Sequence, residues 1–114
     1  MNPSDILKYG DQFFRKTLEG LPQSTWEMGN VCGRWSVKDI IAHLAAYEHM
    51  LKEVLAPFAG VTIETPTLAQ INEIGPAAWN DAAVEARRGR TPAEALAEYS
   101  DTYQHTQSKL VPNI

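Results

Sequence analysis

The sequence contains three histidines, His43, His49 and His105, whose side chains could bind a metal or take part in catalysis. Imidazole titrates near neutral pH and is the commonest metal ligand in proteins. His43 falls at the flank of the apolar face of a predicted helix, beside Tyr47, where it suits either a metal ligand or a hydrogen-bonded structural residue. His49 lies about 120° around that helix from His43 and about 9 Å along it. The two cannot bind one ion within the helix, and we expect His49 to face solvent.

Glu48 is the candidate catalytic residue. By helical angle it lies near the middle of the apolar face of the same predicted helix. A carboxylate there must find a partner or line a polar cavity, because burying an unpaired charge is costly. We therefore interpret Glu48 as a general base or as a residue that orients one. A buried contact with Tyr99, Tyr103 or an arginine is the alternative interpretation.

His105 is the second candidate metal ligand, because Asp101 lies four residues before it on the same face of the last predicted helix. An imidazole and a carboxylate at this spacing can form a mixed ligand pair. An exposed helix pair is the plainer interpretation. Cys32 is the only cysteine, which excludes an internal disulfide and a multi-cysteine metal site. We interpret Cys32 as a passive thiol.

The elements that must position these side chains are three long predicted helices, in which apolar residues recur at helical spacing. The first begins near residue 2 or 4, ends at Gly20 and Pro22, and has a broad apolar face that includes Ile6, Leu7, Phe13, Phe14, Leu18 and Leu21. The second spans residues 36–56, and the third begins at Thr91 and ends at Pro112. The second and third begin with the capping-box pairs Ser36/Asp39 and Thr91/Glu94.

Shorter helices are predicted between the second and third long segments. A helical turn at residues 67–73 is followed by a helix at residues 80–88, which Asn80 can cap and Gly89 can terminate. No segment alternates with period two, so the sequence predicts one all-α domain over residues 1–114. Up-down bundles usually have four helices. We therefore expect a truncated form, a partner chain that covers the open groove, or a three-helix bundle padded by the middle segment.

Composition narrows the function classes. The 114 residues include 10 Lys and Arg against 14 Asp and Glu, for a net charge of −4, which argues against a nucleic-acid phosphate backbone as partner. The basic run Arg87–Arg90 follows a helical pattern and is interpreted as cations at a helix C-terminus. No apolar stretch approaches the roughly 20 residues of a membrane span. The N-terminus has no signal-peptide pattern, so we expect a cytoplasmic protein.

Two stretches of the sequence resemble the DinB-like four-helix bundles. The first is Gly33–Leu44, GRWSVKDIIAHL, with Glu48 following, whose Trp-Ser-Val-Lys-Asp-Ile-x-Ala-His-Leu pattern is similar to that of the superfamily. The second is Trp79–Arg87, WNDAAVEAR, followed by Thr91–Glu94, TPAE. It resembles the DfsB branch, in which an aromatic-Asn-Asp segment precedes the third long helix. The resemblance covers nearly the whole chain.

The resemblance implies an up-down-down-up helical bundle, often dimeric, of which this chain holds three long helices and the short middle ones. In many members a divalent metal, commonly zinc or nickel, lies between helices, and the histidine of the first pattern, here His43, is its first ligand. The other ligands are typically a His-x-x-x-His pair in a fourth long helix. That pattern is absent from this sequence, so the predicted metal site is incomplete in this chain.

The superfamily includes thiol-dependent transferases and isomerases, hydrolases, and proteins that protect against reactive electrophiles. The resemblance therefore implies a metal-dependent hydrolase or transferase that acts on a small reactive molecule. A metal held by His43 would activate a water or thiol, with Glu48 or Asp39 orienting it. The alternatives are a bundle that binds a small molecule without catalysis, and a self-associating fragment without activity. The expected partners are a small-molecule ligand and a second copy of the chain.

Overall fold

The computed structural model describes residues 3–29 and 35–114, and the regular elements in this part of the chain are helices. This confirms the all-α prediction. Cys32 and its interpretation as a passive thiol lie outside the described residues. The elements are α1 (Pro3–Glu19), η1 (Gln23–Thr25), α2 (Val37–Leu55), η2 (Ala56–Ala59), α3 (Pro66–Ile74), α4 (Pro76–Ala86), α5 (Pro92–His105), η3 (Thr106–Leu110) and η4 (Val111–Asn113).

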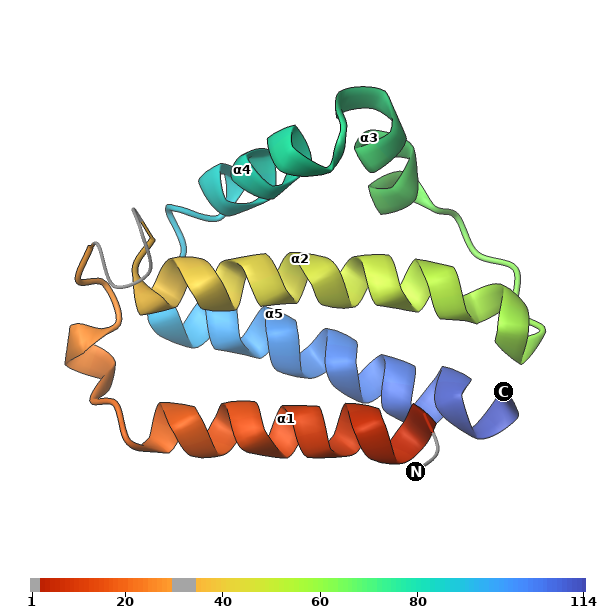
Figure 1. Ribbon diagram of the computed structural model, residues 1–114, viewed down its shortest axis with the longest axis horizontal. Coiled ribbons are helices and arrows are strands. Elements are labelled where there is room, and N and C mark those ends of the chain that lie inside the picture. The colour runs from red at the N-terminus through yellow and green to blue at the C-terminus, as the bar shows by residue number, and fades with distance from the viewer. Residues whose placement is uncertain (1–2, 30–34) are drawn as a thin grey trace.

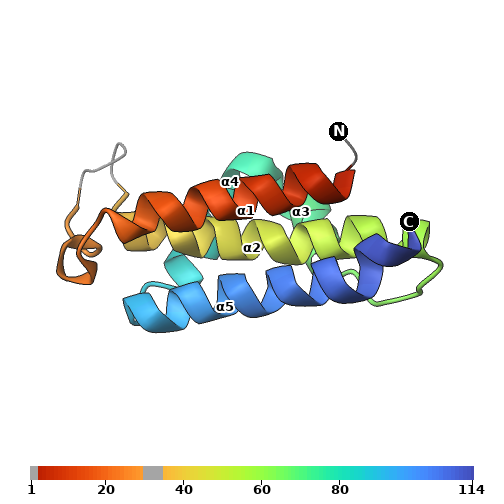
Figure 2. The same ribbon diagram turned by 90° about the horizontal axis from the view of Figure 1, so that it is seen from below.

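The three long helices form a bundle, and the two short ones cover one side of α2 (Figure 1). Helix α1 runs opposite to α2 and α5, which are parallel to each other, as both views show (Figures 1 and 2). This up-down-down order of α1, α2 and α5 agrees with the expected bundle. No helix among the described residues is long and apolar enough to cross a membrane.

Capping boxes fix where α2 and α5 begin, as the sequence predicted. The Ser36 hydroxyl accepts a hydrogen bond from the Asp39 backbone N–H at 3.1 Å, and the Asp39 carboxylate accepts one from the Ser36 N–H at 3.1 Å. Thr91 and Glu94 make the same reciprocal pair at 3.1 and 2.9 Å. These bonds satisfy backbone donors that have no partner inside the helix.

The short helices differ in part from expectation. The turn expected at residues 67–73 is α3. Helix α4 begins at Pro76, not at Asn80, because Gly75 adopts φ 86° and ends α3 while Pro76 occupies the first turn of α4. Asn80 therefore lies inside the helix and does not cap it. The helix ends at Ala86, before Gly89.

The core is built around small side chains of α2. Ala42, Ala45 and Ala46 are at most 2% exposed, and such small side chains let neighbouring helices approach α2 closely. A second group of buried residues joins α1, α2 and α5 near one end of the bundle: Leu18, Trp26, Ile41 and Ala95.

The apolar face predicted for the first helix is only partly buried. Leu18 is buried, Leu7 and Phe14 are half-buried, but Ile6 and Phe13 are 57% and 76% exposed. The predicted face is wider than the strip of α1 that the other helices can cover. One chain therefore leaves the outer part of this face open.

Candidate functional site

A buried polar cluster lies where α1, α2 and α5 meet. Asp11 of α1 is only 8% exposed, and its carboxylate accepts a hydrogen bond of 2.8 Å from the hydroxyl of buried Tyr99 in α5. Arg15 Nε contacts the two Asp11 oxygens at 3.1 and 3.0 Å, and its Nη2 donates to Ser100 at 3.0 Å. Asp11 is therefore a charged group held inside the bundle by a phenol and a guanidinium.

Glu48 extends this cluster from α2. Its Oε2 atom is buried and has no hydrogen-bond partner in residues 3–29 and 35–114. Burial raises the pKa of Glu48, the negative charge of Asp11 raises it further, and His49 lowers it, with the result at about 7. A carboxyl group with this pKa can both give and take a proton at neutral pH, as a general acid or base requires.

The tyrosines of α5 take part in the same electrostatic environment. Burial raises the pKa of Tyr99, and its hydrogen bond to Asp11 and the charges of Asp11 and Glu48 raise it further. Burial and the same two carboxylates raise the pKa of Tyr103. Both phenols therefore stay protonated and can donate a hydrogen bond at neutral pH.

The sequence analysis predicted a buried polar role for Glu48 but did not consider Asp11. The alternative interpretation was a buried contact of Glu48 with Tyr99, Tyr103 or an arginine; the Tyr99 hydroxyl instead donates to Asp11. A signal for Asp11 was present, because it lies four residues after Leu7 and seven before Leu18. An acidic residue within the apolar face of a helix points to a buried partner.

His43 lies on another side of α2, within a group of aromatic rings. Its ring centroid is 5.1 Å from that of Trp35 and 4.5 Å from that of Tyr47, and Tyr47 in turn contacts Trp79 of α4. Burial lowers the pKa of His43, so the imidazole is neutral at pH 7. Its Nδ1 atom is buried and has no hydrogen-bond partner among the residues that the structure describes.

His105 lies far from His43. Its side chain is exposed, and His49 pairs with Glu98 across α2 and α5. The contact between His49 and Glu98 places these two residues at the same height in the parallel helices α2 and α5. His43 lies six residues before His49, and His105 lies seven residues after Glu98. His43 and His105 are therefore about 20 Å apart along the helices. One ion cannot contact both within a chain.

The described residues do not bring together a set of ligands for the metal that the resemblance implies. In residues 3–29 and 35–114, no three His, Cys, Asp or Glu side chains come together in a way that could hold an ion. The lone Nδ1 of His43 supplies one ligand only. The metal-ligand roles of His43 and His105 therefore stay predictions. Among the described residues, neither histidine has the additional ligands beside it that an ion needs.

His49 is not the solvent-facing residue that was expected. It is half-buried, and its Nε2 lies 2.9 Å from Glu98 Oε2. Arg87 Nε and Nη2 donate to Glu98 at 2.9 and 3.0 Å, and Arg90 also pairs with it. Burial tends to raise the pKa of Glu98, but the hydrogen bonds from His49 and Arg87 and the charges of Arg87 and Arg90 outweigh it and bring that pKa to about 2.

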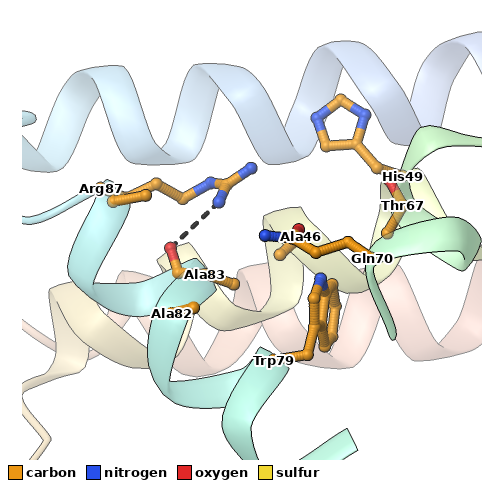
Figure 3. A pocket seen from close by; sticks show the side chains of 9 residues that line it. Ala46, His49, Thr67, Gln70, Trp79, Ala82, Ala83 and Arg87 are labelled. Carbon is orange, nitrogen blue, oxygen red and sulfur yellow. Dashed lines mark hydrogen bonds between the residues drawn. The ribbon is translucent and has the colours of Figure 1, made fainter. Parts of the chain in front are cut away.

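Two cavities lie beside His49. One, of about 440 Å³, is lined by Lys52, His105 and the apolar side chains of Val61, Ile63 and Leu110, among others. The other, of about 100 Å³, lies between α2, α3 and α4 and is bounded by Trp79 and Arg87 (Figure 3). The larger cavity is in the size range of small-molecule sites. His105 thus lines a pocket without being part of a ligand cluster.

Residues 7–111, nearly the whole chain, match the sequence profile of a protein family. The family is described as the mycothiol maleylpyruvate isomerase N-terminal domain. No curated protein and no solved structure matches the chain.

Proposed function

This chain belongs to the mycothiol maleylpyruvate isomerase N-terminal domain family, a DinB-like domain, and on that premise we propose that it transforms a small reactive molecule with Glu48 as the acid–base residue. The observation that carries the proposal is the half-buried carboxyl of Glu48, with an unpartnered oxygen and a pKa of about 7. The narrower DfsB resemblance stays a prediction, as does a zinc or nickel ion.

The family name pairs a thiol, mycothiol, with the isomerisation of maleylpyruvate. A thiol becomes a strong nucleophile when it loses its proton. We propose that Glu48 takes the S–H proton and the sulfur adds to one carbon of an electrophilic double bond. The proton then returns to the neighbouring carbon. The former double bond is now a single bond, and after rotation about it the loss of the thiol and the proton re-forms the double bond with the other geometry. Retention of the adduct instead gives a transferase product.

The surrounding residues support this role for Glu48 by setting its charge state. Asp11 is paired with Arg15 and Tyr99, and its negative charge keeps the affinity of Glu48 for a proton high. A general base is most effective when its pKa lies near the working pH. Asp11, which is paired, thus has a structural role, and Glu48, which is unpaired, has the reactive role.

The test is an isomerisation assay with mycothiol and maleylpyruvate as probes, comparing the wild-type chain with Glu48→Gln. We expect the wild-type rate to rise with pH through an apparent pKa of about 7, and Glu48→Gln to lower the rate by about 100-fold or more. Glu73→Gln, at an exposed position in α3, is the control and should match the wild type.

Two results would overturn the proposal. If Glu48→Gln retained the full rate, Glu48 would not be the acid–base residue. If mycothiol bound to the wild-type chain and stabilised it without any turnover, the non-catalytic binding bundle would be the better description.

A further inference from the structure

The smaller cavity beside α4 has features of a binding site that are separate from Glu48. Its apolar wall is made of alanine methyl groups, from Ala46 of α2 and from Ala82 and Ala83 of α4. Figure 3 shows the guanidinium of Arg87, the amide of Gln70 and the nitrogen edge of Trp79 directed toward the same space. The cavity therefore combines an apolar wall with several N–H donors.

The described hydrogen bonds leave two N–H groups of Arg87 without a partner. The described contacts use three of the five guanidinium N–H groups, two on Glu98 and one on the Ala83 carbonyl at 3.0 Å. Glu98 also accepts from His49 and Arg90. Its two oxygens are thus fully occupied, so it cannot accept the remaining Arg87 donors.

The cavity borders a network of ion pairs. Glu98 is one carboxylate that faces two guanidinium groups, those of Arg87 and Arg90, and an imidazole. No Asp or Glu lines the cavity itself. Arg90 also lies near the carboxylate of Glu94, but the N–H groups of Arg87 that Glu98 does not accept meet no acidic side chain among the residues that line the cavity. Such a position favours an anion.

The size of the cavity limits the ligand. Its volume is about 100 Å³, whereas a dry cavity of about 150 Å³ holds benzene, which has six heavy atoms. The space therefore suits about four heavy atoms. We propose that this cavity binds a short-chain carboxylate of the size of acetate, with the carboxylate on Arg87, Gln70 and Trp79 and the methyl group against the alanine wall. The proposal does not rest on the proposed catalytic function.

The experiment is a titration of the ¹⁵N-labelled full chain with sodium acetate at constant ionic strength. We expect a saturable shift of the Trp79 indole N–H resonance. The indole of Trp26 is an internal control, because its N–H donates to the Leu21 carbonyl at 3.1 Å and should not shift. Benzoate is too large for the cavity and should give no saturable shift.

A matched pair of variants tests the location of the site. Ala82→Val fills the cavity and should weaken acetate binding by about tenfold or more. Ala78→Val adds the same group at an exposed position of the same helix that does not line the cavity and should leave binding unchanged. A linear, unsaturated shift of the Trp79 indole, an equal response from Trp26, or full binding by Ala82→Val would overturn the proposal.

Discussion

At the scale of single residues, Glu48 is the proposed acid–base group, and its position costs stability when it is ionised. A half-buried carboxyl with one unpartnered oxygen and a nearby Asp11 charge is disfavoured in its ionised form. The folded chain therefore binds the Glu48 proton more tightly than the unfolded chain does. Functional sites commonly retain such unfavourable groups because the shifted pKa is what the reaction needs.

The difference between the pKa of Glu48 in the folded and in the unfolded chain predicts how the stability of the domain depends on pH. The pKa of Glu48 rises from 4.5 to about 7 on folding, so its contribution is most favourable below pH 4.5 and is lost as the pH rises to about 7. The loss amounts to at most about 3–4 kcal/mol. Glu48→Gln, which cannot ionise, should be more stable than wild type at pH 8 by about 1–3 kcal/mol, measured by urea unfolding.

The control for this prediction is Glu19→Gln, at an exposed position near the end of α1. It should retain the wild-type fall in stability between pH 4.5 and 8. A Glu48→Gln chain that was less stable than wild type at pH 8 would show that the carboxylate makes a favourable contact when it is ionised.

At the scale of elements, sequence reasoning succeeded where the signal was local. The capping boxes at Ser36 and Thr91 predicted the starts of α2 and α5 correctly, because both partners lie within one turn. The predicted start of α4 at Asn80 was wrong. The helix begins at Pro76, because Pro76 and the positive φ of Gly75 outweighed the cap that Asn80 offers.

The partners of the candidate site could not be predicted in the same way. Asp11 meets Tyr99 and His49 meets Glu98 across different helices. Which faces of two helices meet depends on how the whole bundle packs, and helical angles within one segment do not contain that information. The sequence therefore indicated Glu48 as a polar residue on an apolar face but did not identify the charge that raises its pKa.

Helix α3 shows how one element can depend on another. It has no side-chain cap of its own. Instead, the buried carboxylate of Glu53 in α2 accepts hydrogen bonds from the backbone N–H groups of Thr67 and Leu68 at 3.1 and 2.9 Å. A negative charge at this end also complements the helix dipole. The first turn of α3 is therefore attached to α2 by one side chain, while Ile71 packs against the buried group that includes Trp79.

Removing the side chain of Glu53 should release the first turn of α3 without unfolding the bundle. In Glu53→Ala, two backbone donors lose their partner, so we expect amide hydrogen exchange in α3 to become about tenfold faster or more. Exchange in α5 should stay close to its wild-type rate. Glu53→Gln keeps one oxygen acceptor and should give an intermediate rate. Unchanged exchange in α3 for Glu53→Ala would show that Thr67 and Leu68 find other acceptors.

At the scale of the molecule, the outer face of α1 is open and apolar. Ile6, Tyr9 and Phe13 are 57%, 53% and 76% exposed and recur at helical spacing. Contiguous exposed apolar residues on one helix face are typical of protein interfaces. A second copy of the chain is the partner that the resemblance to often-dimeric bundles implies, and this face is where we predict that it binds.

Phe13→Asp tests this prediction, because a charge at the most exposed position of the face would be buried without a partner in the dimer. We expect the wild-type chain to sediment as a dimer and Phe13→Asp to raise the dissociation constant by about tenfold or more. Phe58→Asp is the matched control, since Phe58 is 71% exposed but lies in η2, and its variant should remain dimeric. A wild-type chain that sedimented as a monomer at all concentrations, or a Phe13→Asp dimer as tight as wild type, would contradict the prediction. Because Phe13 is already exposed in the single chain, a loss of dimer in this variant could not be attributed to unfolding of the bundle.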